Sequence, residues 1–399
     1  MTIWICNPFD ILPGEEGRQM RYALLSEALV RAGHRVVFWS SDFHHLLKTK
    51  RRVPMSYCHN GIDVRLVPTM PYYWNIGLRR LWSHRQFARD WQRLAVADVA
   101  ATKQKPDVIV CSTPPVSLFS AGERLAKRFN AQVLLDVQDV WPETFYRVLP
   151  RHFRWLGKQL FMPLHDKAQQ AYQRADGVSS VSEAYNTIIK RDDLKVFPLG
   201  MKLPENLGYE TKSDVLRLCY VGNLGSGYCL EAVLSGMEQL IKNKKNVQLT
   251  VAGDGPKRGL VEKYATQYPQ ITYQGFVGCD ELDAVLRNSD AGVVPMKTSS
   301  GVSIPNKIVD YAGYGLAVLN GLEGASEKVL SEYDAGVMYQ VEVSQSFADA
   351  AARMLDNPSW VLRMRRNARK LAEEKFDAEK IYPAFAQWIN ALTQRHKSI

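Results

Sequence analysis

Short apolar runs rich in β-branched residues alternate along the chain with longer segments whose apolar positions recur every three or four residues. This pattern predicts strands alternating with helices, which is typical of parallel sheets. In the first half, strands are expected at 3–6, 36–40, 64–67, 108–111, 133–137 and 177–181. In the second half, they are expected at 216–221, 247–252, 271–273, 291–294, 317–319 and 336–339. The sequence therefore predicts an α/β protein with two tandem doubly wound, Rossmann-like domains.

Residues that interrupt the periodic pattern mark the join between the two halves. Pro198, Gly200 and Pro204 fall close together, and such residues are typical of linkers. A length of 399 residues also fits two domains better than one. We therefore expect an N-terminal domain over 1–196, a linker over 197–204, a C-terminal domain over 205–374, and a C-terminal helix over 375–399 that packs back on the N-terminal domain.

Charge and composition narrow the classes of function. Residues 1–199 hold 28 Lys and Arg against 18 Asp and Glu, whereas residues 200–399 hold 23 against 23, so the net charge of +10 belongs to the first half. This asymmetry favours an anionic partner there: a nucleic acid, an acidic membrane surface or a phosphate-bearing substrate.

Neither a signal peptide nor a membrane-spanning run is visible in the sequence. Six scattered cysteines, expected to be reduced and mostly buried, and the lack of HExxH and Asp-x-Asp motifs argue against a metal centre.

Ligands of doubly wound sheets bind beyond the carboxyl ends of the strands, so the loops there are the places to look for chemistry. The loop 13–19 contains glycines and precedes a helix, which indicates either an anion-binding turn or only a turn. The loop 220–227 holds three glycines and Ser226, with no lysine of the Walker A type after them. It predicts a phosphate cradle and disfavours kinase chemistry.

Two other loops carry charged side chains. Lys307 falls in the first turn of a predicted helix, where a cation is unfavourable unless an anion binds, and Asp310 follows one turn later with a carboxylate suited to a ribose diol. A solvated helix face is the alternative for both. After the strand 133–137, Asp139 and Glu143 suit a polyol or a phosphate-linked substrate and Trp141 suits a sugar face, although a simple helix cap is equally open for Asp139.

Residues 72–93 interleave aromatic and basic side chains: Trp74, Trp82, Phe87 and Trp91 with Arg79, Arg80, Arg85, Arg89 and Arg93. At helical spacing this composition is that of a helix lying on an anionic membrane, and the stretch 153–161 is a second candidate. The alternative for each segment is a helix with core aromatics and a solvated arginine face. Binding of single-stranded nucleic acid is a minor hypothesis, because no RNA-binding or helix-turn-helix motif is present.

Four stretches, in this order, resemble the retaining glycosyltransferases of the GT-B fold, in family 4 of the sequence classification. They are YVGNLG at 220–225, VAGDGP at 251–256, YQGFV at 273–277 and SIPNKIVDYAGYG at 303–315. The chain is most similar to the bacterial branch that builds capsules, O-antigens and exopolysaccharides, in which a P-x-K-x-x-E-Y segment and an Asp-x-Trp-Pro-Glu loop recur; residues 139–143 read DVWPE. The resemblance implies two domains facing each other across a cleft. It also implies transfer of a hexose-type sugar from a nucleoside diphosphate sugar to a lipid-linked or oligosaccharide acceptor.

The resemblance also implies roles for single residues. Those for the donor are Gly17, Gly222, Asn223, Phe276, Val277, Ser303, Ile304, Lys307 and Asp310, with Lys307 and Asp139 as the catalytic pair. Together with the basic aromatic segment, it indicates acceptor or membrane contacts at Arg79, Arg80, Trp82, Arg85, Trp141 and Glu143. The implied partners are a polyprenyl diphosphate-linked glycan and the inner face of the plasma membrane, with no nucleic acid, no metal and no cofactor.

The chain departs from the family pattern at four positions. Asn223 and Tyr228 stand where Arg and Lys are frequent, Val302 stands at or near the first Glu of a paired-Glu signature, and Asp310 replaces the ribose-binding Glu. A catalytically weak relative that binds membranes or nucleic acid is therefore one alternative. A nucleotide-sugar epimerase of the same architecture is another.

Overall fold

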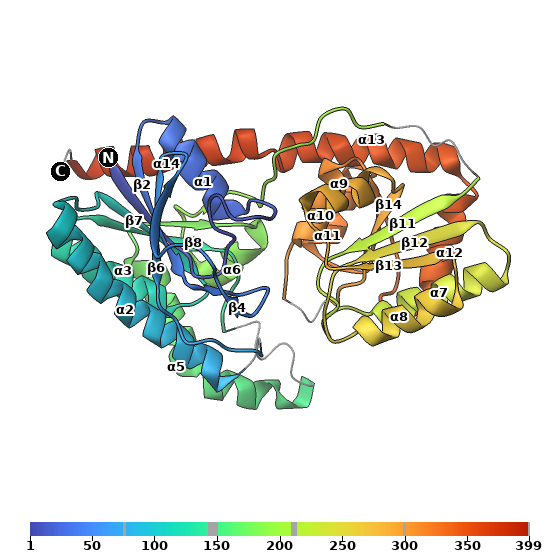
Figure 1. The fold of residues 1–399 in the computed structure, drawn as a ribbon, viewed down its shortest axis with the longest axis horizontal. Coiled ribbons are helices and arrows are strands. Elements are labelled where there is room, and N and C mark those ends of the chain that lie inside the picture. Colours follow the sequence, from blue (N-terminus) through green and yellow to red (C-terminus); the bar gives the residue numbers. More distant parts are fainter. Residues whose placement is uncertain (75–76, 143–150, 209–213, 298–300, 398–399) are drawn as a thin grey trace. The chain divides into compact units, whose positions relative to one another are not determined.

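The computed structural model describes residues 1–74, 77–142, 151–208, 214–297 and 301–397, and it divides into two compact units. Unit 1 comprises Met1–Pro198 and Glu379–Ile399, and unit 2 comprises Leu199–Ala378. Each unit has its own sheet of mostly parallel strands with helices on both faces (Figure 1). The predicted α/β class with two Rossmann-like domains is confirmed.

Unit 1 is built on an eight-stranded sheet in the order β10-β9-β8-β7-β1-β2-β6-β5. Its strands are β1 (Thr2–Cys6), β2 (Arg35–Ser41), β5 (Ser56–His59), β6 (Ile62–Val67), β7 (Val108–Thr113), β8 (Gln132–Val137), β9 (Gly177–Ser180) and β10 (Lys195–Val196), and β3 (Phe43–His44) pairs separately with β4 (Thr49–Lys50). Its helices include α1 (Arg21–Arg31), α2 (Leu78–Thr102), α3 (Ser117–Phe129), α5 (Arg154–Arg174) and α6 (Asn186–Ile189).

The central strands of unit 1 form because they are apolar on both faces. Every residue of β7 is buried, and only the first residue of β2 is exposed. Such strands are typical of parallel sheets covered by helices on both sides. β5 is the exception, since it pairs antiparallel with β6 through a turn in which Asn60 and Gly61 both have positive φ. This Asn-Gly turn matches the right-handed twist of the hairpin.

Unit 2 has a six-stranded, fully parallel sheet in the order β13-β12-β11-β14-β15-β16. Its strands are β11 (Leu216–Val221), β12 (Val247–Ala252), β13 (Ile271–Gly275), β14 (Ala291–Val294), β15 (Ala317–Asn320) and β16 (Gly336–Met338). Its helices are α7 (Leu230–Lys242), α8 (Arg258–Gln267), α9 (Cys279–Arg287), α10 (Asn306–Gly313), α11 (Ala325–Glu332), α12 (Ser344–Leu355) and α13 (Pro358–Lys375). Two apolar clusters, one on each face of the sheet, form the core.

The last helix, α14 (Ala378–Lys397), packs on unit 1. Its Phe385 ring stacks on Phe197 with ring centroids 4.3 Å apart, and Trp388 contacts the same ring at 5.7 Å. Gly177 at the start of β9 lies under Leu392 and Trp388, where a Cβ would have no room. Within the described part of the chain, no helix is long and apolar enough to span a membrane. All six cysteines are free and four of them are buried.

Candidate functional site

The strand order of unit 2 places its crevice between β11 and β14. From β11 the chain winds outward through β12 and β13, and from β14 it winds the other way through β15 and β16. At such a switch point the two loops beyond the carboxyl ends diverge and leave room for a ligand. The glycine loop after β11 and the segment that leads into α10 both start there.

Glycines are required in the loops after β11 and β12 because these loops lie backbone against backbone. Gly222 and Gly253 have φ values of +122° and +142°, and a Cβ on Gly253 would overlap the carbonyl group of Gly222. The loops are joined by hydrogen bonds from Gly222 N to Ala252 O, at 2.8 Å, and from Leu224 N to Asp254 O, at 2.9 Å. They therefore form a rigid floor beside the crevice.

Lys307 on α10 reaches into this floor. It is only 8% exposed; its Nζ donates to Val221 O and lies 4.5 Å from the ring centre of Tyr220 and 4.8 Å from that of Tyr228. A Cβ on Gly222 would collide with this Nζ. Burial lowers the pKa of Lys307 to about 8, while the nearby Asp310 carboxylate opposes the shift. The solvated-face alternative for Lys307 is therefore wrong, and two rings and a carbonyl hold its charge at the carboxyl end of β11.

The other predicted donor residues of unit 2 lie at different distances from Lys307. Asp310 is half-buried one turn along α10, and Ser303, whose carbonyl oxygen accepts from Ser326 Oγ at 2.7 Å, immediately precedes Ile304 and the helix start. Asn223 is exposed, and its carbonyl oxygen accepts from Tyr220 Oη at 2.5 Å. The structure thus brings Gly222, Lys307 and Asp310 together.

Phe276 and Val277 follow β13, which lies two strands from β11 in the sheet. The Phe276 side chain is 70% exposed. Val277 lines an open groove of about 630 Å³ that is also lined by Arg217 and Ser289, near the amino ends of β11 and β14, so this groove is not the crevice at the carboxyl ends. A nucleobase at this position therefore requires a ligand that extends from β11 across the ends of β12 and β13.

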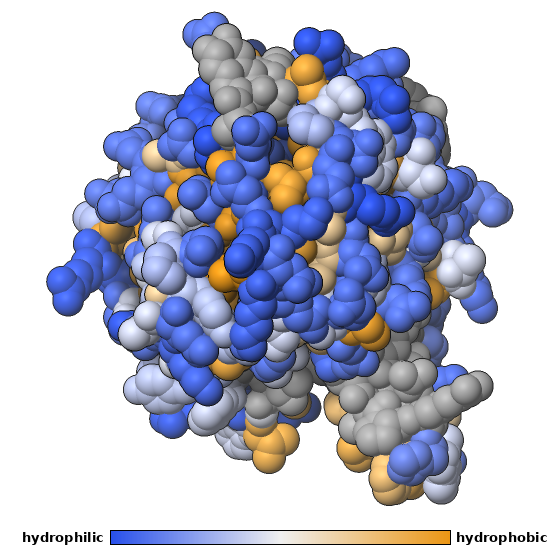
Figure 2. Space-filling model, turned by 90° about the vertical axis from the view of Figure 1, so that its right-hand side faces the viewer, coloured by the Kyte–Doolittle hydropathy of each residue, from blue (hydrophilic) through white to orange (hydrophobic). Residues whose placement is uncertain are grey.

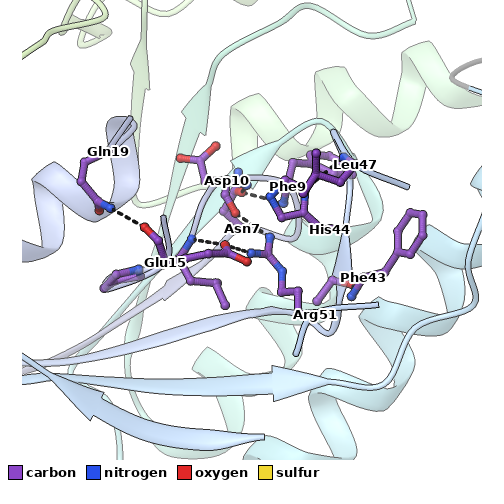
Figure 3. A network of polar contacts seen from close by, with 12 residues as sticks. Asn7, Phe9, Asp10, Glu15, Gln19, Phe43, His44, Leu47 and Arg51 are labelled. Carbon is purple, nitrogen blue, oxygen red and sulfur yellow. Dashed lines mark hydrogen bonds and ion pairs between the residues drawn. The ribbon is translucent and has the colours of Figure 1, made fainter. Parts of the chain in front are cut away.

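In unit 1 the corresponding crevice lies where β1 is flanked by β2 and β7. A polar network fixes the loop after β1 (Figure 3). Asn7 Oδ1 accepts from Phe9 N and Asp10 N at 2.8 and 2.7 Å, and Arg51 binds Glu15 and donates to Asp10 O at 2.8 Å. The carboxylate of Asp10 in turn accepts from Tyr22 N at 3.2 Å in the first turn of α1.

Gly17 lies in this loop with a φ of +127°, where a side chain would be strained and its Cβ would lie 2.8 Å from Ile11 Cδ1. The glycine is needed for the course of the loop itself. The Asp10 carboxylate accepts a hydrogen bond in the first turn of α1, so the protein's own carboxylate already lies at this helix N-terminus. Burial raises the pKa of Asp10 to about 6.

Asp139 and Trp141 follow β8. Trp141 Nε1 donates to Asp139 Oδ2 at 3.2 Å, and the Trp141 ring has the guanidinium of Arg80 above it at 5.0 Å. Trp141 is only 5% exposed. The expectation of an open aromatic face for a sugar at Trp141 is therefore wrong, because Arg80 covers the ring. Glu143 lies outside the described residues.

The aromatic and basic side chains of residues 72–93 do not all lie on one face of α2. Phe87 and Trp91 are buried in the core of unit 1, as the core alternative requires, whereas Trp74 and Trp82 are exposed. The arginines divide as well: Arg79, Arg85, Arg89 and Arg93 are exposed, but Arg80 is turned toward Phe9, Tyr72 and Trp141. The placement of Arg80 on a lipid-facing stripe is therefore wrong.

Two family models match the chain in two consecutive parts. The model described as "Glycosyl transferase 4-like domain" matches residues 17–197, in unit 1, and the model described as "Glycosyl transferases group 1" matches residues 216–357, in unit 2. Each unit therefore contains a stretch that matches a glycosyltransferase domain model, and the two sheets have the arrangement of the GT-B fold.

Individual proteins resemble the chain at low identity. The α-D-kanosaminyltransferase of Streptomyces kanamyceticus is 24% identical over 179 residues, which are 44% of this chain and 45% of that protein. The chain spans about half the length of the curated relatives it matches. Among solved structures, sucrose-phosphate synthase from Thermosynechococcus elongatus superposes with a TM-score of 0.76 at 18% identity over 99% of this chain and 100% of that one. WaaG, a glycosyltransferase involved in lipopolysaccharide biosynthesis, superposes with a TM-score of 0.67 at 13% identity over 97% and 99%.

Proposed function

We propose that the chain is a retaining glycosyltransferase that moves a hexose-type sugar from a nucleoside diphosphate sugar to a lipid-linked or oligosaccharide acceptor in bacterial surface polysaccharide synthesis. The observation that carries the proposal is the buried cation of Lys307 at the carboxyl end of β11, beside a glycine floor. The motif resemblance supports the bacterial branch, and WaaG, whose fold is similar, acts in lipopolysaccharide biosynthesis. Unit 2 is the donor domain and unit 1 the acceptor domain.

In this proposal the protein stabilises the leaving group. Breaking the bond between sugar and diphosphate develops negative charge on the diphosphate, and Lys307 with backbone N–H groups of the glycine loop stabilises that charge. Asp310 accepts hydrogen bonds from the ribose hydroxyls, and Phe276 and Val277 contact the base. The proton of the acceptor hydroxyl passes to the leaving phosphate oxygen, so neither a metal nor a separate general base is required. Asp139, in unit 1, is proposed to contact the acceptor.

Nucleotide sugars are expected to stabilise the chain selectively. In a thermal unfolding series with UDP-, GDP-, ADP- and dTDP-sugars, with and without Mg²⁺, one base class should raise the unfolding temperature without metal, since a ligand at 100 times its Kd adds about 2.7 kcal/mol. Asp310→Ala should weaken the affinity of that ligand at least tenfold, and the exposed Asp349→Ala on α12 should not change it. Failure of every nucleotide sugar to stabilise the chain would contradict the proposed function.

We also propose that unit 1 docks on the anionic inner face of the plasma membrane. Of the exposed large apolar side chains in the described residues, only Phe276 and Val343 belong to unit 2. The face shown in Figure 2 is mostly hydrophilic, with scattered hydrophobic patches. The others lie in unit 1, including Tyr73, Trp74, Leu78, Trp82, Phe153, Trp155, Leu156, Leu160 and Met162. Leu78 and Trp82 share the outer face of α2 with Arg85, Arg89 and Arg93, the mixed apolar and basic face of an interfacial helix.

Removing two of these side chains should release the chain from vesicles. A Trp82→Ser and Trp155→Ser double variant is expected to bind phosphatidylglycerol-containing vesicles at least tenfold more weakly, because each exposed tryptophan contributes about 2 kcal/mol when its apolar surface leaves water. The measurement is co-sedimentation with vesicles of increasing anionic content. Val343→Ser, in unit 2, is the matched control. Equal binding by the double variant and the wild type would exclude this membrane surface.

A further inference from the structure

Four basic side chains of unit 1 gather beyond the carboxyl ends of its strands: His45, Lys48, Arg80 and His84. His45 and Lys48 lie in the turn between β3 and β4, and Arg80 and His84 lie in the first two turns of α2. Direct contacts link them in pairs. Arg80 Nε donates to His84 Nε2 at 3.3 Å, and Lys48 Nζ lies 3.4 Å from His45 Nδ1. We call these four residues the basic cluster.

Aromatic rings surround the lysine and the arginine of the basic cluster. The guanidinium of Arg80 lies 5.4 Å from the ring centre of Phe9, 5.9 Å from that of Tyr72 and 5.0 Å from that of Trp141. The Nζ of Lys48 lies 4.9 Å from the ring centre of Tyr72. The rings come from the loops after β1, β6 and β8. Five segments of unit 1 that are distant in sequence therefore converge around Lys48 and Arg80.

Burial and repulsion between neighbouring positive charges dominate the electrostatics of the basic cluster. Burial is the first cause that lowers the pKa of His45 to about 2, that of His84 to about 3 and that of Lys48 to about 8, and the charge of Arg80 lowers all three further. His44 also acts on His45, and Lys48 does so more strongly. Burial also lowers the pKa of Arg80, and the Tyr72 hydroxyl and then the Asp139 carboxylate oppose this shift.

His84 supplies a hydrogen-bond donor that has no partner among the described residues. Its Nε2 accepts from Arg80, so the neutral ring carries its proton on Nδ1. His84 is 5% exposed, and no atom of the described residues accepts a hydrogen bond from Nδ1. A buried donor without an acceptor is unfavourable, and an acceptor atom of a ligand would remove this cost.

We propose that the basic cluster binds the phosphate or diphosphate group of the acceptor, with Lys48 and Arg80 as its cations and His84 Nδ1–H as a neutral donor. The assignment to the acceptor rests on the proposed function, whereas the anion site itself rests on the geometry of unit 1. Exposed apolar side chains lie next to the cluster in the turn between β3 and β4, where Leu46 and Leu47 directly precede Lys48. They suit the apolar chain of a phosphorylated amphiphile.

All eight histidines of the chain fall in unit 1, so their ring signals report this unit and not the donor site of unit 2. The experiment titrates inorganic pyrophosphate, and separately farnesyl diphosphate, into the full chain with ¹⁵N-labelled histidine, and it assigns His45 and His84 from His45→Asn and His84→Asn variants. The two signals are expected to shift saturably with both ligands. Farnesyl diphosphate should bind at least tenfold more tightly than pyrophosphate.

Variants separate the anion site from general attraction by positive charge. Arg80→Gln and Lys48→Gln should each weaken pyrophosphate binding at least tenfold, whereas Arg124→Gln, an exposed arginine on α3, should bind as the wild type does. Lys48 is half-buried in a short turn whose Leu46 and Leu47 are exposed, so its variant tests the proposal even where Arg80→Gln does not fold. Equal affinity in the Lys48 and Arg124 variants, or unshifted His45 and His84 signals, would overturn the anion site. Equal affinity for the two ligands would overturn only its assignment to an apolar acceptor.

The proposed function and the anion site can fail separately. If no nucleotide sugar stabilises the chain, the His45 and His84 signals are still expected to shift with pyrophosphate.

Discussion

A Lys307→Met variant is expected to transfer sugar with a kcat/KM about a hundredfold to a thousandfold below that of the wild type, because loss of one group that stabilises developing charge costs about 3–4 kcal/mol. Methionine keeps the unbranched chain between Tyr220 and Tyr228 but removes the cation. The measurement is release of nucleoside diphosphate from the stabilising donor in the presence of a membrane lipid extract. Lys328→Met, exposed on α11 of the same unit, is the matched control. A loss below fivefold would remove Lys307 from the transition state.

The pH dependence gives a second readout for the same residue. Burial lowers the pKa of Lys307 to about 8, so its cation is present below that pH and is lost as the pH rises. Because kcat/KM reports the free enzyme, it should fall as the pH rises through about 8. Burial raises the pKa of the neighbouring Cys219 thiol to about 12, so no thiolate forms there in this range. The falling limb should be absent in Lys307→Met, and a limb that persists would assign it to another group.

The strands of both sheets could be predicted because most of them are apolar on both faces. The runs at 216–221, 247–252 and 291–294 correspond to β11, β12 and β14 without change of bounds. β5 was not predicted, although Asn60 and Gly61 give the strongest short-range hairpin signal, because an edge strand such as Ser56–His59 has only partly buried and exposed residues. The two-residue strands β3, β4 and β10 are too short for any pattern.

The direction of Arg80 shows where the sequence argument for α2 failed. Positions 80, 84, 87 and 91 are separated by four, three and four residues, so they share one face of the helix, and the burial of Phe87 and Trp91 turns Arg80 and His84 inward. Positions 78, 82, 85 and 89 share the opposite face. The aromatic side chains do not form one stripe, because Trp82 and Phe87 are five residues apart and therefore lie on different faces of the helix. The spacing contained the signal for Arg80 and His84.

The basic cluster and the position of Lys307 differ in how visible they are from sequence. Lys307 could be chosen because its charge conflicts with its place in a helix, and a conflict of this kind is local. His45 and Lys48 become notable only beside Arg80, and their approach depends on five separate segments. No periodic pattern in one segment encodes such a convergence. The polar part of a site is therefore harder to predict than the sheet that supports it.

Asp136 in β8 is the centre of a fully buried polar network in unit 1. Its side chain accepts from Arg21 Nε and the second guanidinium nitrogen at 2.7 and 2.8 Å, from Tyr22 Oη at 2.7 Å and from Ser179 Oγ at 2.6 Å. Arg21 also donates to the carbonyl oxygens of Phe197 and Pro198, at 2.8 and 3.1 Å. The network therefore joins α1, β8 and β9 to Phe197 and Pro198, where the chain leaves unit 1.

Asp136→Asn is expected to lower the stability of unit 1 by about 3–5 kcal/mol, because it leaves the Arg21 guanidinium buried without its counter-charge. For a unit of this size the unfolding temperature should fall by about 10 °C. Tryptophan fluorescence follows unit 1 selectively, since eight of the nine tryptophans fall in it. Asp166→Asn, exposed on α5, is the control. An Arg21→Met and Asp136→Leu double variant should recover only part of the loss, because Tyr22 and Ser179 would still lack their acceptor, and full recovery would show that the charge pair alone stabilises this network.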